Sequence, residues 1–341
     1  MSEYSLILGG YTDGPGQGIY RMGYNLQQEI FSAAQLVLAS HNPSIGLKNG
    51  DLWYVVEEAE PGKIHVFDAG NNWQPLLTLN CGGASPCHLA CNTGSGHLAV
   101  ANYMGGSVSI FALDKNGLPQ GAPFIIQHTG RSVTARQEAP HAHYVEFAVN
   151  KAGQLGLYAV DLGLDQVLRY PLLVGNQWGA GTIVFKAQAG DGPRHFARHP
   201  HNGKLYLLNE LSSTVSVIDV ADEQWTVQQR ISTLPDNYQG ENIAAHISIS
   251  DNGQFIYTSN RGHHSIAVFA VQPDGTLESI QIKPCGGLWP RYFTLLNAAA
   301  RLIVAHEHSD SVVAFAIEPD GCLRGPQAVG AVPKPTFVAQ A

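Results

Sequence analysis

The sequence lacks an excess of positive charge. Among its 341 residues, 19 lysines and arginines stand against 27 aspartates and glutamates, which gives a formal net charge of −8 at pH 7. Proteins that bind nucleic acids or anionic membrane surfaces do so mainly through clustered basic residues. We therefore expect neither kind of partner.

Long apolar runs and a secretory signal are also missing. No stretch approaches the roughly 20 apolar residues that a membrane-spanning helix requires. The segment before Gly9 contains no lysine or arginine, whereas a secretory signal begins with basic residues. The five cysteines are an odd number, which favours reduced thiols over a framework of disulfides. We therefore expect a cytoplasmic location.

Motifs for cofactors and for activated serines are absent as well. The sequence contains no G-x-S-x-G pattern, no P-loop and no dinucleotide-binding fingerprint. Cys87 and Cys91 have a spacing that metal ligands use, but no second pair accompanies them. We therefore predict neither a cofactor nor a metal site.

The sequence does contain a repeated pattern of short apolar runs separated by turn residues. Each copy starts with a proline or alanine beside polar residues and continues through an apolar run, a glycine-containing turn, and a run of β-branched or aromatic residues. A polar cluster and a last hydrophobic run complete the copy. The copies are spaced by 43 to 54 residues, which suits a four-stranded propeller blade. They begin at Pro43, Pro86, Pro140, Pro193, Ala245 and Pro290.

The two ends of the chain supply fragments of one further copy. Residues 6–8 and 19–22 match the middle of a blade, and residues 335–338 match its beginning. Together they predict a seventh blade, which closes the ring with strands from both termini. No linker or change in composition separates domains. We therefore predict one all-β domain over residues 1–341, a seven-bladed β-propeller of four-stranded antiparallel blades; a pair of β-sandwiches fits the regular repeat less well.

Unusual polar residues gather at two places in each copy, where the first strand begins and where the second strand ends. In a propeller blade these two places lie on the same face, so the side chains should meet at one mouth of the central channel. The competing explanation is structural, because strand ends need side chains that satisfy backbone groups. The residues are Glu57, Glu58, Cys87, His88, Asn102, Tyr103, His141, His143, Asp161, Arg194, His195, Asn209, Glu210, His246, Asn260, Arg261, Arg291, His306, Glu307 and His308.

Three arginines of this set predict an anionic ligand. Arg194, Arg261 and Arg291 would repel one another around a channel mouth unless an anion neutralised them. In a protein of net negative charge, an anionic substrate must be attracted by such a local cluster. We therefore expect an anionic small molecule as the partner.

Two histidines predict proton transfer. His141 and His143 alternate at the start of a strand, so both rings lie on one side of it. An imidazole that titrates near neutrality suits a general base for water, whereas a metal here would lack ligands and be repelled by the arginines. Glu210 either orients the base or forms a structural ion pair with Arg194. Which histidine is the base stays open.

Five segments of the sequence share a resemblance to one family. They are residues 140–147, 161–165, 192–195, 209–210 and 246–262. They resemble the lactonase family of seven-bladed propellers, which includes propeller-type 6-phosphogluconolactonases. A related branch contains the fungal carboxy-muconate lactonising enzyme, whose metal-free site uses a histidine, arginines and a glutamate. The turns at residues 201–203 and 251–253 depart from the Pro-Asp-Gly that is usual in the family, which affects turns and not the site.

The resemblance implies hydrolysis of a phosphorylated sugar lactone, 6-phospho-D-glucono-1,5-lactone, to 6-phosphogluconate in the pentose phosphate pathway. It implies His141 or His143 as the base, with Arg194, Glu210 and Arg261 around the substrate. We assign catalytic roles to the two histidines, Arg194 and Glu210. The residues that we expect to bind substrate are Arg261, Arg291, His195, Asn209, Asn260, His246 and Glu307.

Other functions stay open beside this one. Reversible lactonisation of a carboxylated muconate would use the same histidine to move a proton at carbon. A non-catalytic binding platform would instead expose aromatic patches on one face, and a calcium-dependent lactonase would lose its activity in EDTA. The sequence leaves open the oligomeric state, and whether Glu57, Asn102 and His306 contact substrate.

Overall fold

Nearly all regular structure in the chain is β-strand. The computed structural model describes residues 3–220 and 224–341, in which strands β1 to β30 form seven antiparallel sheets. Two single turns of 3-10 helix, η1 (Ala135–Gln137) and η2 (Asn297–Ala299), interrupt them. In this part of the chain, no helix has the length and apolar character needed to cross a membrane.

The chain divides into two compact units. The first comprises Met1–Ser44, His195–Val220 and Thr226–Ala341, and the second comprises Ile45–Arg194 with a short segment that ends at Trp225. Four sheets belong mainly to the first unit and three to the second. That residues 1–341 fold as one domain stays a prediction.

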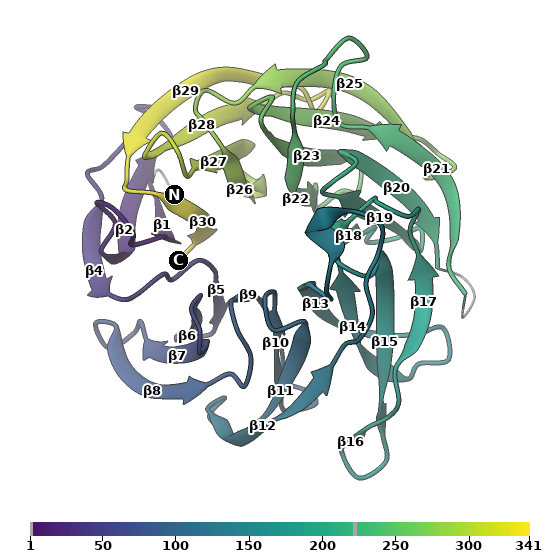
Figure 1. Ribbon diagram of the computed structural model, residues 1–341. Coiled ribbons are helices and arrows are strands. Elements are labelled where there is room, and N and C mark those ends of the chain that lie inside the picture. Colours follow the sequence, from purple (N-terminus) through teal and green to yellow (C-terminus); the bar gives the residue numbers. More distant parts are fainter. Residues whose placement is uncertain (1–2, 221–223) are drawn as a thin grey trace. The chain divides into compact units, whose positions relative to one another are not determined.

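One sheet of the first unit joins the two ends of the chain. In this terminal sheet the last strand pairs with the first, with Val338 opposite Leu8, and Figure 1 shows both termini beside these strands. The predicted completion of a blade by strands from both termini is therefore confirmed. The strands are β1 (Glu3–Gly10), β2 (Gly18–Asn25), β3 (Ile30–Phe31), β4 (Gln35–Ala39) and β30 (Pro335–Gln340).

The other three sheets of the first unit are four-stranded meanders, in which strands that follow one another in sequence are neighbours. They are β18 (Pro193–Arg198), β19 (Lys204–Asn209), β20 (Thr214–Asp219) and β21 (Thr226–Ser232); β22 (Ile243–Ile249), β23 (Phe255–Arg261), β24 (Ser265–Val271) and β25 (Leu277–Pro284); and β26 (Pro290–Leu296), β27 (Arg301–His306), β28 (Ser311–Ile317) and β29 (Leu323–Ala331).

The second unit repeats the same arrangement three times, with one extra two-residue strand. Its sheets are β5 (Gly46–Asn49), β6 (Leu52–Glu57), β7 (Lys63–Asp68) and β8 (Gln74–Asn80); β9 (Pro86–Asn92), β10 (His97–Asn102), β11 (Ser107–Leu113) and β12 (Pro119–Gln127); and β13 (Ala142–Val149), β14 (Leu155–Asp161), β15 (Gln166–Leu173), β16 (Gln177–Trp178) and β17 (Thr182–Lys186).

The middle strands of the sheets are buried on both faces, because neighbouring sheets within a unit pack face to face. All six residues of β10 are buried, and the same holds for nearly all of β27. A strand that is covered on both sides needs no polar alternation, which is why these strands read as continuous apolar runs.

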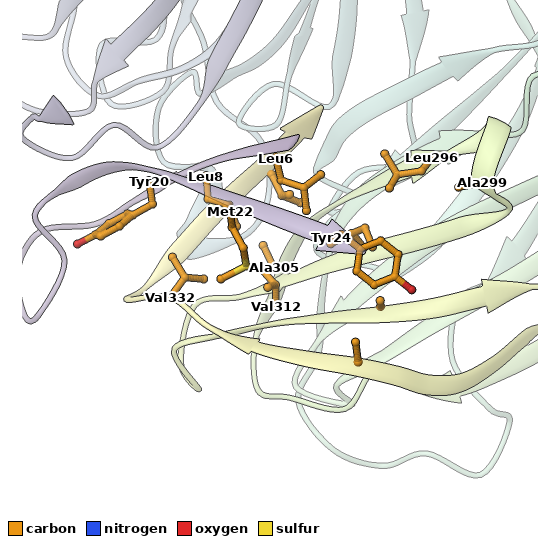
Figure 2. Packing of buried hydrophobic residues seen from close by; sticks show 14 residues of the cluster. Leu6, Leu8, Tyr20, Met22, Tyr24, Leu296, Ala299, Ala305, Val312 and Val332 are labelled. Carbon is orange, nitrogen blue, oxygen red and sulfur yellow. The ribbon is translucent and has the colours of Figure 1, made fainter. Parts of the chain in front are cut away.

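One such core lies between the terminal sheet and the sheet of β26–β29 (Figure 2). Leu6 and Tyr24 come from the terminal sheet, and Leu296 and Val312 come from its neighbour. Each large apolar side chain that is fully buried contributes about 1.5–3 kcal/mol. Packing therefore holds the terminal strands in place together with the pairing of β1 and β30.

The first strand of several sheets carries a β-bulge near its start. Cys87 is the extra residue in β9, His143 in β13 and Arg291 in β26, since the strand registers skip them. The same irregularity occurs at Ala245 and His246 in β22. A bulge turns its extra side chain out of the alternation of the strand. The fold thus gives a special orientation to polar residues at strand entries, where the sequence also placed them.

Candidate active site

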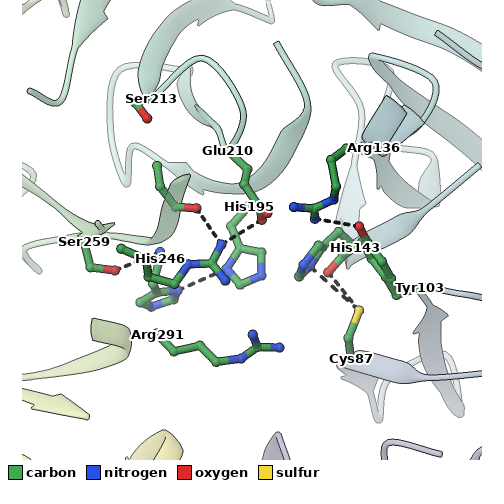
Figure 3. Close-up of polar contacts among 12 residues, drawn as sticks. Cys87, Tyr103, Arg136, His143, His195, Glu210, Ser213, His246, Ser259 and Arg291 are labelled. Atoms are coloured by element: carbon green, nitrogen blue, oxygen red, sulfur yellow. Dashed lines mark hydrogen bonds and ion pairs between the residues drawn. The ribbon is translucent and has the colours of Figure 1, made fainter. Parts of the chain in front are cut away.

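The bulged strands of the second unit bring polar and aromatic side chains together. We name Cys87, Tyr103, Arg136, His141 and His143 the histidine–tyrosine cluster. His143 Nδ1 lies 3.8 Å from Cys87 Sγ, and the His143 ring meets the Tyr103 ring nearly edge-on with 5.3 Å between centroids. Figure 3 shows His143 facing Cys87 and Tyr103. These contacts fix the orientation of a histidine that is almost fully buried.

His141 is held by stacking and by hydrogen bonds to the backbone. Its ring lies nearly parallel to that of Tyr103, with 4.4 Å between centroids and 15° between planes. Its Nδ1 lies 3.1 Å from the Tyr103 carbonyl oxygen, which only accepts, so Nδ1 carries the hydrogen. Its backbone N–H donates to Asp161 Oδ1 at 2.8 Å. The protein itself therefore fixes the tautomer of His141.

A buried arginine acts on a neighbouring histidine in the same unit. Arg194 is 3% exposed at the start of β18. Burial, and then the charge of Arg194, lower the pKa of His88 to about 3. The His88 ring contacts the Tyr144 ring at 4.2 Å between centroids, and its Nδ1 accepts a hydrogen bond from Val145 N–H. His88 is thus neutral near pH 7, and Arg194 is the cation of the two.

The first unit contains a cluster of charged side chains. We name Tyr11, Glu210, Arg261, Arg291 and Glu307 the ion-pair cluster. Arg261 Nη2 lies 3.0 Å from Glu210 Oε2, and Arg291 Nη1 lies 3.8 Å from Glu307 Oε2. Arg291 also donates to the Tyr11 hydroxyl at 2.8 Å. Two positive and two negative charges therefore balance within the cluster.

Two polar atoms of the ion-pair cluster are buried without a hydrogen bond among the described residues, Arg261 Nε and Glu307 Oε2. Burial lowers the pKa of Arg261, against the opposing effect of Glu210, but arginine remains cationic because its ordinary pKa lies far above neutrality. Buried polar atoms in proteins are nearly always hydrogen-bonded. One donor and one acceptor are therefore available to a polar ligand.

His195 and His246 form a hydrogen-bonded pair in the first unit. Their Nδ1 atoms lie 3.1 Å apart, so one ring donates and the other accepts. His246 also stacks on Tyr292 with 3.8 Å between centroids, and its backbone N–H donates to Ser259 Oγ at 3.1 Å (Figure 3). The two facing nitrogens therefore share one hydrogen.

Comparison with known proteins identifies the family of this chain. The family model described as "Lactonase, 7-bladed beta-propeller" matches residues 5–340. The chain belongs to the seven-bladed β-propeller lactonases. The fold class predicted from the repeat is therefore confirmed, and the seven sheets are the blades of this lactonase.

Relatives of this lactonase are named for two related sugar lactones. The 6-phosphogluconolactonase of Bacillus subtilis (strain 168) is 32% identical over 323 residues, which are 92% of this chain and 91% of that protein. The structure of the Pseudomonas aeruginosa periplasmic gluconolactonase, PpgL, covers 100% of this chain and 99% of its own, with a TM-score of 0.92 and 25% identity. A Lactobacillus plantarum protein structure covers 99% of both chains, with a TM-score of 0.90 and 27% identity.

Two predicted substrate-binding residues of this lactonase make structural hydrogen bonds. Asn209 Nδ2 donates to Thr214 Oγ1 and to Ser216 Oγ, at 3.0 Å each. Asn260 Nδ2 donates to Ser265 Oγ at 3.1 Å, across the turn after β23, and to the Thr233 carbonyl oxygen of the preceding blade at 2.8 Å. These amides fasten the turn that follows the second strand of each blade. Their contact with substrate stays a prediction.

Two of the three arginines that were predicted to need an external anion have carboxylate partners in the protein. Glu210, from another blade, pairs with Arg261, and Glu307, which follows the end of β27 beside the start of β26, pairs with Arg291. The expectation of unneutralised like charges was therefore wrong for these two arginines. Their contact with an anionic substrate stays a prediction.

The sequence placed Tyr103 among the polar residues at the strand ends, without assigning it a role, and gave no indication of Arg136. Tyr103 follows the buried Asn102, as Glu210 and Glu307 follow the last residue of their own second strands. That repeated position was the available signal for Tyr103. Arg136 lies in η1, between two blades, where no repeat predicts its role, and its Nη2 donates to the Tyr103 hydroxyl at 3.0 Å.

The described residues show neither a disulfide nor a group of side chains suited to a metal ion. Over residues 3–220 and 224–341, no three histidine, cysteine, aspartate or glutamate side chains are grouped so that they would hold a metal ion. The five cysteines are free thiols. Cys87 contributes its sulfur to the surroundings of His143, as described above.

Proposed function

We propose that this lactonase hydrolyses 6-phospho-D-glucono-1,5-lactone to 6-phosphogluconate. The name of the Bacillus subtilis relative supports this substrate, and the Pseudomonas aeruginosa structure supports the same chemistry on a lactone without phosphate. The histidine–tyrosine cluster carries the proposal, because two buried, oriented histidines belong to the same unit as the buried Arg194. The proposal includes the pentose phosphate pathway and a cytoplasmic location.

His143 is the stronger candidate for the general base. His141 is stacked under Tyr103, its Nδ1 is occupied, and its Nε2 lies 3.7 Å from Glu138 Oε1. His143 stands at a bulge, where a side chain is turned out of its strand, and Cys87 lies at its Nδ1. Nε2 of His143 is then the nitrogen that accepts a proton from water.

The proposed reaction begins when His143 Nε2 takes a proton from water and the water oxygen attacks C1 of the lactone. The carbonyl group becomes a tetrahedral oxyanion, which the positive charge of Arg194 stabilises. The bond between C1 and the ring oxygen then breaks, and His143 returns its proton to that oxygen. A general base contributes about 10²–10⁴ in rate, and charge stabilisation contributes roughly 3–4 kcal/mol.

The predicted roles of the first unit remain part of the proposal. Glu210 is assigned to catalysis, and Arg261, Arg291 and Glu307 to substrate binding. The buried atoms Arg261 Nε and Glu307 Oε2 support this, because a sugar carries both hydroxyl donors and oxygen acceptors.

A coupled assay tests the substrate. Glucose-6-phosphate dehydrogenase generates the phospholactone in place, and 6-phosphogluconate dehydrogenase reports its hydrolysis. We expect hydrolysis faster than the spontaneous reaction, with and without EDTA. No acceleration would exclude this substrate and make plain gluconolactone and carboxylated muconates the next assays, whereas loss of activity in EDTA would favour a calcium-dependent lactonase.

Substitution of Arg194 tests the mechanism. We expect Arg194→Ala to lower kcat/KM by at least about tenfold in protein that remains folded, because the oxyanion loses its cation. Arg198→Ala is the matched control in the same strand, and should stay within about twofold of the parent. Equal activities of the two variants would remove Arg194 from the mechanism.

A further inference from the structure

The segment that joins β12 to β13, residues 128–141, is held by many hydrogen bonds and leads into the histidine–tyrosine cluster. At its start, His128 Nδ1 lies 2.6 Å from Asp161 Oδ2, and the Tyr170 hydroxyl lies 3.0 Å from His128 Nε2. Near its end, the buried Gln137 donates from Nε2 to the Leu162 carbonyl oxygen at 2.9 Å. The start of the segment is thereby bonded to β14 and β15, and its end to the turn between them.

The middle of the segment is tied down as well. The Ser132 hydroxyl donates to Asp165 Oδ2 at 2.6 Å, and Ser132 N–H donates to the Gln137 carbonyl oxygen at 3.0 Å. The Thr134 hydroxyl donates to Gln137 Oε1 at 3.0 Å. A loop held at so many points presents its outward side chains in a defined place, at little entropic cost on binding.

Arg136 is the exposed cation that this segment presents to the cluster. Its Nη2 donates to the Tyr103 hydroxyl at 3.0 Å, as Figure 3 shows. The same Tyr103 ring stacks on His141 and meets His143 edge-on. Tyr103 therefore contacts both the Arg136 guanidinium and the two candidate bases.

We propose that Arg136 binds the phosphate group of a phosphorylated lactone and sets the preference of this site for phosphorylated over plain sugar lactones. The inference rests on the proposed function, which supplies the lactone chemistry. It assigns a specificity-determining role to a residue that does not touch the reacting atoms.

The chemistry of both partners fits this assignment. A guanidinium is planar, carries five N–H donors and pairs with two phosphate oxygens at once. In the phospholactone the phosphate is attached through C6 to C5, and the ring oxygen separates C5 from the C1 carbonyl, so the ligand of the phosphate must lie to one side of the base. Arg136 lies to one side of His143 in this way, because both residues contact Tyr103. The nearby carboxylate Glu138 faces His141, at 3.7 Å from its Nε2.

The decisive experiment compares kcat/KM for two substrates that differ only in the phosphate, 6-phospho-D-glucono-1,5-lactone and D-glucono-1,5-lactone. We expect Arg136→Ala to lower the ratio of the two values by roughly 10- to 100-fold, since a hydrogen bond to a charged group is lost. The change should appear mainly in KM for the phosphorylated substrate. Arg131→Ala, an exposed arginine of the same segment, is the matched control and should keep the parental ratio.

Two further variants separate charge from geometry. Arg136→Lys keeps a positive charge without the planar fork, and should restore part of the lost ratio. Tyr103→Phe keeps the ring against both histidines but removes the hydroxyl that positions Arg136. We expect it to lower the ratio in the same direction by a smaller factor.

Binding of the reaction product keeps the test independent of turnover. In calorimetry, 6-phosphogluconate should bind the parent more tightly than gluconate, and Arg136→Ala should remove roughly tenfold or more of that difference. If Arg136→Ala keeps both the parental substrate ratio and the parental affinity for 6-phosphogluconate, the inference is overturned. If the parent hydrolyses neither lactone, the proposed function fails, and the calorimetry still decides whether Arg136 binds phosphate.

Discussion

The two clusters of this lactonase hold their side chains by different forces. In the ion-pair cluster, buried guanidinium and carboxylate groups hold one another, as Arg261 and Glu210 do. In the histidine–tyrosine cluster, stacking and a backbone carbonyl hold the ring of His141. Removing one partner of a buried ion pair leaves a charge behind, whereas removing a neutral ring does not. We therefore expect substitutions to destabilise the protein strongly in the ion-pair cluster, and to lower activity with little loss of stability in the histidine–tyrosine cluster.

Substitution of His143 in the histidine–tyrosine cluster should cause the greatest loss of activity. His143→Asn should lower kcat by about 10²–10⁴ in the coupled assay while the melting temperature changes little, because the general base is lost and no charge is stranded. His141→Asn should cost no more than about tenfold, since we assign that ring to the support of Tyr103. A larger loss in His141→Asn than in His143→Asn would exchange the two roles.

Removing a carboxylate from the ion-pair cluster should lower the stability of the protein. Glu210→Gln leaves the buried Arg261 without its carboxylate, and should lower the free energy of unfolding by about 3–5 kcal/mol in a denaturant titration. Glu318→Gln is the matched control, because its pair with Arg324 is exposed and worth about 0–1 kcal/mol. Equal destabilisation in the two variants would contradict the contrast between the clusters.

The stability of the protein should depend on pH through His306, which precedes Glu307 of the ion-pair cluster. His306 is fully buried, and burial lowers its pKa to about 4 from the ordinary 6.5. Between pH 6.5 and pH 4 this histidine is protonated in the unfolded chain but neutral in the folded protein. The contribution of neutral His306 to the free energy of unfolding is therefore complete above pH 6.5 and is lost as the pH falls toward 4. The loss amounts to roughly 3 kcal/mol at about 1.4 kcal/mol per pKa unit.

The variant His306→Asn tests that pH dependence. Asn102 and Asn260 occupy the same register in other blades and donate to serine hydroxyls at the following turn. Asparagine should therefore fit here, face Ser311, and remove the loss of stability between pH 6.5 and 4. Denaturant titrations across this range give the slope, and the exposed His201→Asn should leave it unchanged. A parental slope in His306→Asn would show that another group titrates.

Substitution of His246 in the pair with His195 should cause a small loss of activity. His246→Phe keeps a ring stacked on Tyr292 but removes the nitrogen that shares a hydrogen with His195. We expect a loss of about tenfold in kcat/KM and a change in its pH profile, because His195 loses the hydrogen-bond partner of its Nδ1. His246→Asn, which keeps a polar group, should recover part of the activity. A pH profile identical to that of the parent in both variants would limit His246 to packing.

The middle strands of the blades were far more predictable than the outer ones. Residues 98–101 and 302–305 stand out in the sequence as apolar runs, and both lie in second strands whose residues are buried. Outer strands such as β8 and β21 are exposed at most positions, so they carry few apolar residues. A half-exposed edge strand leaves a weak hydrophobic pattern, which is why the sequence located the blades without the bounds of their fourth strands.

Repeat positions indicated which residue types form the candidate site, but not which contacts they make. Repeat positions led to His143, Arg194 and Glu210, because polar residues stand out where each blade turns. The same positions also led to Asn209 and Asn260, whose amides fasten turns. A repeat shows where a side chain starts along the blade, and it cannot show which way the side chain bends.

The sequence by itself determined the blades and the polar residues at their ends, because apolar periodicity and turn residues act over a few positions. Only the tertiary structure decided which partner each residue meets. Arg136 and Tyr103 are 33 residues apart, and His195 and His246 are 51 apart. Such contacts depend on how blades pack and on the bulges that turn single side chains out of their strands, and both arise from pairings between distant segments.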